Sequence, residues 1–179
     1  TKEFIKKNGE FTTNIALISE NRPVFGVIYA PAINQIYWGS ELNGSFMKLD
    51  NKNIQRIRVN EKQGLKVNVV SSRSHKTGAE KDFLRKIGDH EEHQVGSSLK
   101  FCLLASGRAD IYPRFGPTSE WDIAAGDAIL KFSGGGLLDE NRNSILYNKK
   151  RNIINGSFFA FGDRANIDNF YTKFLESTA

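Results

Sequence analysis

The pattern of apolar residues changes near Gly64, and this change limits the fold more than any other feature of the chain. Before Gly64, short β-branched and apolar runs are separated by turn residues such as those at 21–23, a pattern typical of β-strands. We expect strands at residues 13–18, 24–30, 36–39, 44–48 and 55–59. The first part of the chain is therefore predicted to form an antiparallel meander or the edge of a larger sheet.

After Gly64, short apolar runs alternate with stretches of helical period. Phe83, Leu84 and Ile87 lie at helical spacing, and Gly88 ends that pattern. We expect helices at 77–87, 98–106, 121–132 and 165–176, and strands at 66–71, 94–95, 109–112 (ended by Pro113), 137–138 and 158–161. This alternation predicts a layered α/β fold, an α+β sandwich, with units at 1–64 and 65–179.

Composition and charge exclude several classes of protein. Hydrophobic residues make up 39% and charged residues 25% of the chain, which suits a globular core and argues against disorder. The net charge of +5 is spread along the sequence, so we expect no nucleic-acid polymer as a partner. No apolar run approaches the ~18 residues of a membrane span, so we expect no integral membrane segment. The single cysteine, Cys102, cannot form an internal disulfide, which favours a reducing compartment.

Residues 121–126 read Trp-Asp-Ile-Ala-Ala-Gly and are followed by an apolar helix and by three glycines at 134–136. Ser119 and Asp122 have the spacing of a capping box, and the helix dipole favours an acidic residue in a first turn. Taken alone, the pattern allows a role for Asp122 that is limited to capping. A carboxylate is also a suitable ligand for a hard divalent cation.

The order and spacing of these residues resemble the second signature of the inositol monophosphatase superfamily. Residues 1–5 resemble the continuation of its other signature, Asp-Pro-x-Asp-Gly-Thr, from the Thr onward. The resemblance implies that Asp122 binds catalytic Mg²⁺ and contributes to the substrate site, and that Thr1 orients the attacking water. It also implies two or three Mg²⁺ ions whose other ligands lie upstream of Thr1. Residues 1–64 would be the remainder of an N-terminal β-rich subdomain, and we expect a cut or processed N-terminus.

Two cations, Lys100 and Arg114, flank an expected helix and strand, and Ser97 stands where that helix is expected to begin. Arginine offers a planar fork for phosphate oxygens, lysine a point charge, and a helix start offers hydroxyl and N–H donors. These residues, with the segment Ser-Arg-Ser-His at 72–75, are similar to the bisphosphate nucleotidase branch of the superfamily. The resemblance implies that His75, Ser97, Lys100 and Arg114 line a nucleotide and its retained 5′-phosphate. The implied reaction converts adenosine 3′,5′-bisphosphate to AMP and phosphate.

Several alternatives stay open. Lys100 could be a solvated helix residue, Arg114 could pair with Glu120, and His75 could cap the helix near Thr77. The substrate could be an inositol or sugar phosphate, or the chain could bind a nucleotide without cleaving it. One Asp cannot organise two divalent cations, so we expect the 179 residues alone to be inactive. A cytoplasmic location, with peripheral association with the inner membrane as an option, and a homodimer complete the expectations.

Overall fold

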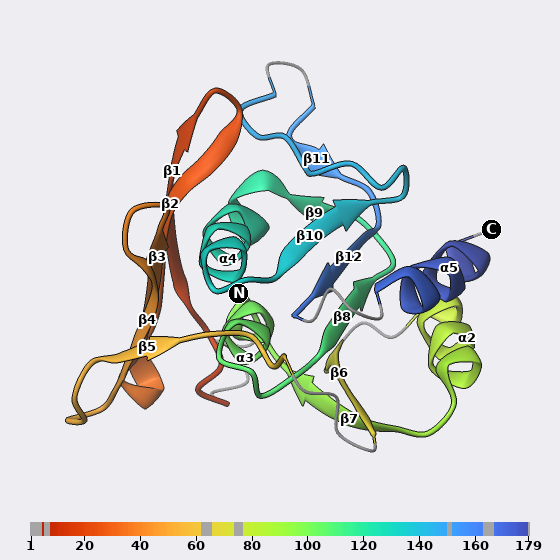
Figure 1. The fold of residues 1–179 in the computed structure, drawn as a ribbon, viewed down its shortest axis with the longest axis horizontal. Coiled ribbons are helices and arrows are strands. Elements are labelled where there is room, and N and C mark those ends of the chain that lie inside the picture. Colours follow the sequence, from red (N-terminus) through yellow and green to blue (C-terminus); the bar gives the residue numbers. More distant parts are fainter. Residues whose placement is uncertain are drawn as a thin grey trace.

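The computed structural model describes residues 5, 8–61, 66–73, 77–149, 152–162 and 167–178, and Figure 1 shows their arrangement. The first sheet is an antiparallel meander with the strand order β1-β2-β3-β4-β5. Its strands are β1 (Thr13–Ser19), β2 (Arg22–Ala30), β3 (Gln35–Ser40), β4 (Gly44–Leu49) and β5 (Gln55–Ile57), with a 3-10 turn, η1 (Pro31–Ile33), after β2. The predicted meander is therefore confirmed.

The second sheet is mixed and has the strand order β10-β12-β8-β6-β7. Its strands are β6 (Val67–Ser72), β7 (His90–Val95), β8 (Ile111–Arg114), β10 (Gly136–Asp139) and β12 (Phe158–Phe161). A separate two-stranded ribbon joins β9 (Thr118–Ser119) to β11 (Ile154–Asn155). The helices are α2 (Gly78–Ile87), α3 (Leu99–Ala105), α4 (Glu120–Phe132) and α5 (Ile167–Thr178).

The elements stack as sheet, helices, sheet, helices, which confirms the predicted layered α/β class (Figure 1). The helices α3 and α4 lie between the two sheets, and α2 and α5 cover the far face of the second sheet. Alternation along β12 supplies both cores: Phe158 and Ala160 pack on the α3–α4 side, whereas Phe159 and Phe161 pack on the α2–α5 side. A strand buried on both faces explains why this run is wholly apolar.

Close approach of α4 to the first sheet depends on a glycine. A Cβ on Gly26 of β2 would lie 2.4 Å from the carbonyl oxygen of Ala125 and 2.8 Å from Cβ of Ala128. Small residues on both surfaces therefore let the helix backbone and the strand backbone come together.

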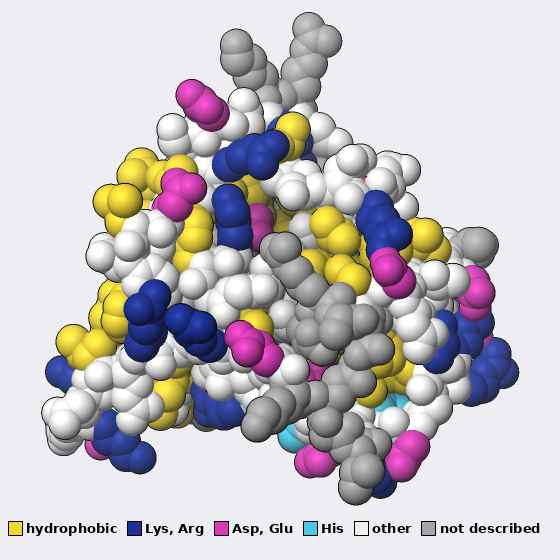
Figure 2. Space-filling model, in the orientation of Figure 1, with side chains coloured by type: hydrophobic (Ala, Val, Ile, Leu, Met, Phe, Trp, Pro, Cys, Tyr) yellow, Lys and Arg dark blue, Asp and Glu magenta, His cyan; other side chains and the backbone are white. Residues whose placement is uncertain are grey.

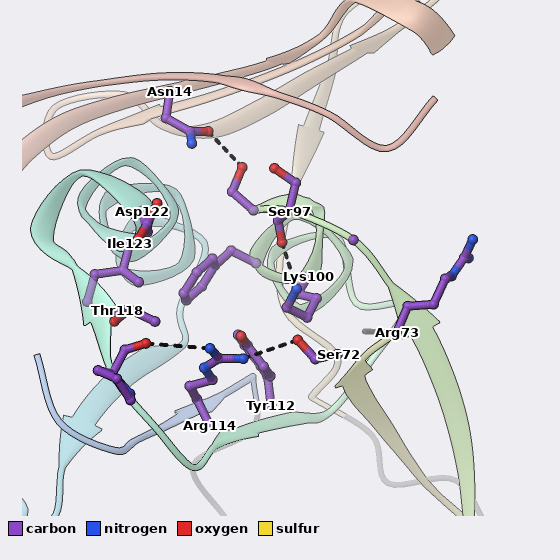
Figure 3. Close-up of a pocket in the computed structure, with 14 residues that line it drawn as sticks. Asn14, Ser72, Arg73, Ser97, Lys100, Tyr112, Arg114, Thr118, Asp122 and Ile123 are labelled. Carbon is purple, nitrogen blue, oxygen red and sulfur yellow. Dashed lines mark hydrogen bonds between the residues drawn. The ribbon is translucent and has the colours of Figure 1, made fainter. Parts of the chain in front are cut away.

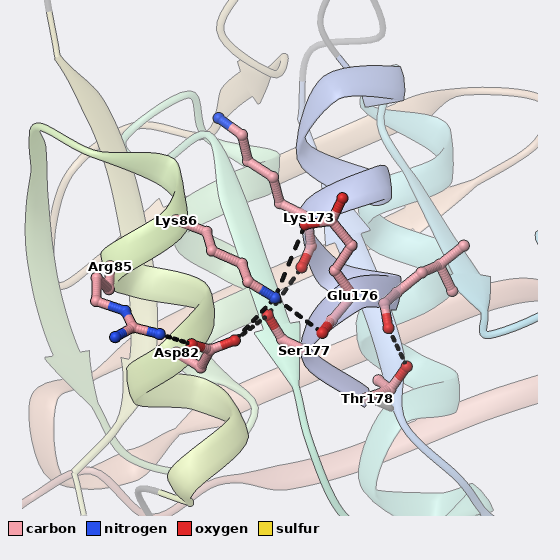
Figure 4. Close-up of polar contacts among 8 residues, drawn as sticks. Asp82, Arg85, Lys86, Lys173, Glu176, Ser177 and Thr178 are labelled. Atoms are coloured by element: carbon pink, nitrogen blue, oxygen red, sulfur yellow. Dashed lines mark hydrogen bonds and ion pairs between the residues drawn. The ribbon is translucent and has the colours of Figure 1, made fainter.

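The outer helices are joined by polar contacts at their ends (Figure 4). Nζ of Lys86 on α2 lies 2.9 Å from Oδ2 of Asp82 and donates to the carbonyl oxygen of Glu176 on α5 at 2.8 Å. The hydroxyl of Ser177 donates to Asp82 Oδ2 at 3.3 Å. These contacts join α2 to α5 next to the apolar core that both helices cover.

Several predicted strands differ from the observed ones in their bounds, and the strand expected at 55–59, for example, ends at Ile57. Two of these differences have a clear physical reason. The strand expected to end before Pro113 runs on to Arg114, and Pro113 pairs with Phe159 of β12. A proline is tolerated there because β6 pairs with β8 only at Ile111, so no neighbour on that side needs its missing N–H. The strand expected at 94–95 begins at His90, because β7 is a polar edge strand without an apolar signal. The predicted unit boundary at 64 lies outside the described residues and stays a prediction. No described helix is long and apolar enough to cross a membrane.

Candidate active site

A cavity of about 220 Å³ opens where the start of β1, the loop at 96–98, the end of β8 and the start of α4 converge (Figure 3). The side chains of Ser97, Lys100, Arg114 and Asp122 all line it. The structure thus brings together four of the six residues expected at the site. The other two, Thr1 and His75, lie outside the described residues.

Asp122 occupies the third position of α4 and is exposed. Its Oδ2 accepts a hydrogen bond from the backbone N–H of Ser119 at 2.9 Å, as expected for a capping box. Its other carboxylate oxygen makes no hydrogen bond with any residue that the structure describes. Asp122 therefore caps α4 and also lines the cavity, and its other carboxylate oxygen is available to bind a ligand.

Arg114 ends β8 and reaches into the cavity (Figure 3). Its Nη1 donates to the hydroxyl of Ser72 at 3.2 Å and its Nη2 to the carbonyl oxygen of Pro117 at 3.5 Å. Its Nε is buried and has no hydrogen-bond partner among the described residues. A buried donor without an acceptor costs about 1–3 kcal/mol, so an anion that accepted from it would be stabilised.

The alternative partner for Arg114, Glu120, is occupied elsewhere. Its carboxylate accepts the backbone N–H groups of Asn148 at 2.7 Å and Lys149 at 3.1 Å, and lies 3.8 Å from Nζ of Lys149. Glu120 therefore anchors the chain segment near residue 149 to the start of α4, and the predicted alternative of an Arg114–Glu120 pair was wrong.

Lys100 is 5% exposed, so the alternative that placed it on a solvated helix face was also wrong. Its Nζ donates to the carbonyl oxygens of Ser97 at 2.8 Å and Val95 at 3.1 Å, and lies 5.3 Å from the ring centre of Tyr112. Burial raises the pKa of Tyr112 well above its usual range, so this ring stays neutral beneath the ammonium group. Lys100 thus supports the loop at 96–98 from below and adds positive charge to the cavity wall.

Ser97 lies in that loop with a φ of 53°, two residues before the first residue of α3. Its hydroxyl oxygen is 2.5 Å from that of Thr12, which precedes β1. The expectation that Ser97 opens the helix was therefore displaced by one position, because Ser98 is the capping residue.

Several lining residues were missed by sequence reasoning, among them Asn14, Ser72, Arg73 and Thr118. Ser72 and Arg73 belong to the Ser-Arg-Ser-His segment at 72–75, so extending the prediction from His75 to the whole segment would have included them. The hydroxyl of Thr118 is buried without a partner among the described residues. Asn14 has no local signal, because β1 reaches the cavity only through contacts between distant segments. Thr118 stands between Arg114 and Asp122 in the sequence, so its closeness to both could have indicated it.

The cavity wall carries more positive than negative charge. Arg73, Lys100 and Arg114 face one carboxylate from Asp122, although Arg73 is also paired with Glu10 at 2.7 Å. This balance suits an anionic ligand. Cys102 is fully buried, and burial raises the pKa of its thiol well above its usual range, so it is not a nucleophile at neutral pH.

Among the described residues that line the cavity, Asp122 supplies the one carboxylate that a divalent cation could bind. The described residues contain no cluster of three His, Cys, Asp or Glu side chains that could hold a metal. Mg²⁺ takes about six oxygen ligands, so the described part of the wall fits a metal as one contributor to its coordination and not as a complete site.

Comparison with known proteins shows which family has this fold. The inositol monophosphatase family model matches residues 1–177. The chain belongs to the inositol monophosphatase family. Its resemblance to that family, expected from residues 1–5 and 121–126, is therefore confirmed.

Within this family, the chain is similar to bacterial nucleotidases. It is 44% identical over 158 residues to the 3′(2′),5′-bisphosphate nucleotidase CysQ of Salmonella typhimurium, covering 88% of this chain and 63% of that protein. It is 42% identical over 169 residues to the CysQ of Buchnera aphidicola, covering 89% and 60%. The chain thus spans under two thirds of the length of these relatives.

Solved structures of the family share the fold. The crystal structure of CysQ from Bacteroides thetaiotaomicron superposes with a TM-score of 0.82 at 36% identity, covering 90% of this chain and 66% of that one. An IMPase from Thermotoga maritima gives a TM-score of 0.79 at 25% identity, covering 98% and 65%. The chain is accordingly related to phosphatases of this family.

Proposed function

We propose that this chain carries the nucleotide-binding wall of a magnesium-dependent phosphomonoesterase that converts adenosine 3′,5′-bisphosphate to AMP and phosphate. The observation that supports it most is the buried, unpartnered Nε of Arg114 in a cavity that also holds Lys100. A nucleotide bisphosphate has one phosphate to lose and one to be held. The similarity to nucleotidases named CysQ supports the same substrate.

In this proposal Arg114 is the principal contact of the retained 5′-phosphate. Its Nε donates to a phosphate oxygen while Ser72 and Pro117 hold the rest of the guanidinium in place. Ser97 contributes its hydroxyl, and Lys100 contributes charge from beneath the loop. His75 lines the nucleotide. Holding one phosphate firmly places the other in line for attack.

Asp122 faces the opposite side of the same cavity and supplies its free oxygen to a metal. Two or three Mg²⁺ ions, when bound, polarise the scissile phosphate, lower the pKa of the attacking water and neutralise the leaving oxygen. Thr1 orients that water. One Asp cannot organise two or three Mg²⁺ ions, so we expect the 179-residue chain alone to show no turnover.

The test measures AMP binding to the full 179-residue chain by isothermal titration calorimetry. Arg114→Ala should weaken AMP binding about 10- to 100-fold, because a hydrogen bond to a charged group contributes about 1.5–3 kcal/mol. The control is Arg85→Ala, which removes the same side-chain type from an 80% exposed position on α2. Equal affinities for wild type and Arg114→Ala would refute the phosphate-holding role.

Turnover provides a second test. Measurable magnesium-dependent hydrolysis by the 179 residues alone would contradict the incomplete metal site. Adenosine 3′,5′-bisphosphate and inositol 1-phosphate could then be compared directly. Loss of activity in Arg114→Ala with the nucleotide alone supports the nucleotidase proposal, whereas equal loss with both favours an inositol or sugar phosphatase.

Location and assembly belong to the same proposal. A cytoplasmic protein is consistent with a single cysteine that is buried and reduced. Self-association as a homodimer is consistent with exposed apolar side chains on the first sheet, such as Ile15 and Leu17, each 60% exposed.

A further inference from the structure

Three alternate residues before and within β1 contact the loop at 96–98. Oε2 of Glu10 accepts the backbone N–H of Gly96 at 2.7 Å. The hydroxyl of Thr12 lies 2.5 Å from that of Ser97 and 2.8 Å from that of Ser98. Oδ1 of Asn14 accepts the Ser98 hydroxyl at 2.7 Å (Figure 3). We call Glu10, Thr12 and Asn14 the strap; their spacing of two is that of side chains on one face of an extended segment.

The loop held by the strap is conformationally demanding. Ser97 has a φ of 53°, a left-handed conformation that costs a residue other than glycine about 1 kcal/mol. Such a conformation persists only when surrounding contacts impose it. Lys100 donates hydrogen bonds to the carbonyl oxygens of Val95 and Ser97. The strap binds the same loop through the N–H of Gly96 and the hydroxyls of Ser97 and Ser98. Ser97 is thereby fixed at the cavity wall from two sides.

The direction of the hydrogen bonds decides what Ser97 can offer a ligand. Ser98 donates to Asn14, so it accepts from Thr12, and Thr12 in turn accepts from Ser97. In this order the proton of Ser97 is committed to Thr12, and the cavity meets only an acceptor. A phosphate oxygen needs a donor.

Turning over the Asn14 amide reverses the order without moving any other residue. Its NH₂ group then donates to Ser98, which frees the Ser98 proton for Thr12, the Thr12 proton for Ser97 and the Ser97 proton for a ligand in the cavity. The two orientations of an amide occupy the same space, so the reversal needs no repacking.

We propose that the strap residues Glu10, Thr12 and Asn14 are positioning residues for Ser97, and that the Asn14 amide sets whether Ser97 donates to a ligand phosphate. This inference rests on the proposed role of Ser97 in holding the 5′-phosphate. It adds a contribution from the segment that leads into and begins the first sheet to a site whose charged lining residues stand on α3, β8 and α4, with Arg73 directly after β6.

The donor switch is tested by a double-mutant cycle on AMP binding to the full chain. In Asn14→Asp the side chain can only accept a hydrogen bond, so the Ser97 proton stays in its hydrogen bond to Thr12. The substitution also adds a negative charge. In a Ser97→Ala background only the charge effect remains. We expect Asn14→Asp to weaken AMP binding about tenfold more in wild type than in Ser97→Ala, the value of one hydrogen bond to a charged group. Equal weakening in both backgrounds overturns the switch.

Two controls separate this inference from the proposed function. Thr12→Ser keeps the hydroxyl and should bind AMP within about twofold of wild type, whereas Thr12→Val should lose about three- to tenfold, the usual contribution of one neutral hydrogen bond. If the wild-type chain does not bind AMP, the proposed function fails. If the wild-type chain binds AMP and Thr12→Val binds it equally well, the strap does not position Ser97 for the ligand.

Positioning by Glu10 is measured without a ligand. In Glu10→Ala the amide of Gly96 loses its acceptor, so its hydrogen-exchange protection should fall about tenfold or more by NMR. Glu10→Gln retains an acceptor oxygen and should keep most of the protection. Unchanged exchange at Gly96 in Glu10→Ala would overturn the positioning role.

Discussion

The two sheets of this protein differ in how completely they are buried. The second sheet has apolar side chains on both faces, and helices cover each face. The first sheet packs its inner face against α4, whereas none of the helices that the structure describes covers its outer face (Figure 1). Alternate residues point outward there and pair across strands: Leu17 with Phe25, Val27 with Trp38, and Trp38 with Phe46.

That outer face is apolar although it meets solvent. Ile15 and Leu17 are each 60% exposed, and Trp38 stacks on Phe46 with ring centres 5.7 Å apart. Figure 2 shows hydrophobic side chains gathered along the flank that carries this sheet. A contiguous apolar patch on a sheet is typical of an interaction surface. An apolar strand face is therefore not always a buried one, because burial also requires another element to pack against it.

The largest expected difference between the two sheets appears when a large side chain is removed from each. Phe159 of β12 is fully buried, and Phe159→Ala should lower the free energy of unfolding by about 3–5 kcal/mol. Phe46→Ala on the half-buried outer face of the first sheet should lower it by about 1 kcal/mol. Urea denaturation measures both, and similar losses would show that the outer face is buried in solution.

The next largest effect concerns the inner face of the first sheet. Gly26→Ala places a Cβ 2.4 Å from the backbone oxygen of Ala125 and should destabilise the fold by up to about 3 kcal/mol. The control is Gly78→Ala at the start of α2, where a Cβ meets nothing within 4 Å. That change should be neutral or stabilise by up to about 1 kcal/mol because alanine favours the helix. A harmless Gly26→Ala would mean that α4 is not seated on β2.

A smaller effect depends on pH and concerns the helix between the sheets. Burial raises the pKa of Asp127 on α4 to about 6, although the Tyr147 hydroxyl donates to it at 2.7 Å. A folded pKa above the unfolded one stabilises the fold below about pH 4, and that contribution is lost as pH rises through about 6. Wild type should therefore lose on the order of 2 kcal/mol more than Asp127→Asn between pH 4 and pH 7. Parallel curves of urea midpoint against pH would contradict this.

The smallest expected change in stability tests the exposed outer face. Leu17→Lys should alter the free energy of unfolding by less than about 0.5 kcal/mol, because surface substitutions rarely do more. It should nevertheless reduce self-association in sedimentation velocity. Leu42→Lys, at a 94% exposed position in the β3–β4 turn, is the matched control and should leave association unchanged. Equal association of all three proteins would exclude the outer face as a contact surface.

Much of the fold could be predicted because its signals are local. The strands of the first sheet follow from short apolar runs separated by turn residues, and α4 from a capping residue, an acidic first turn and small residues. The edge strand β7 could not be predicted in full, because four of its six residues are charged or histidine and only pairing with β6 makes them a strand. Pro113 led to a wrong strand end for the same reason, because a strand tolerates a proline only where the neighbouring strand does not need its N–H.

Local motifs and apolar patterns were enough to predict the family, the layered α/β class and Asp122, Arg114 and Lys100 as candidate site residues. Tertiary structure alone decided that Lys100 is buried, that Thr12 meets Ser97 across 85 positions of sequence, and that the Nε of Arg114 has no partner among the described residues. The physical reason is range. A propensity or a motif reports on neighbours within a few residues, whereas burial and hydrogen-bond satisfaction depend on which distant segments packing brings together.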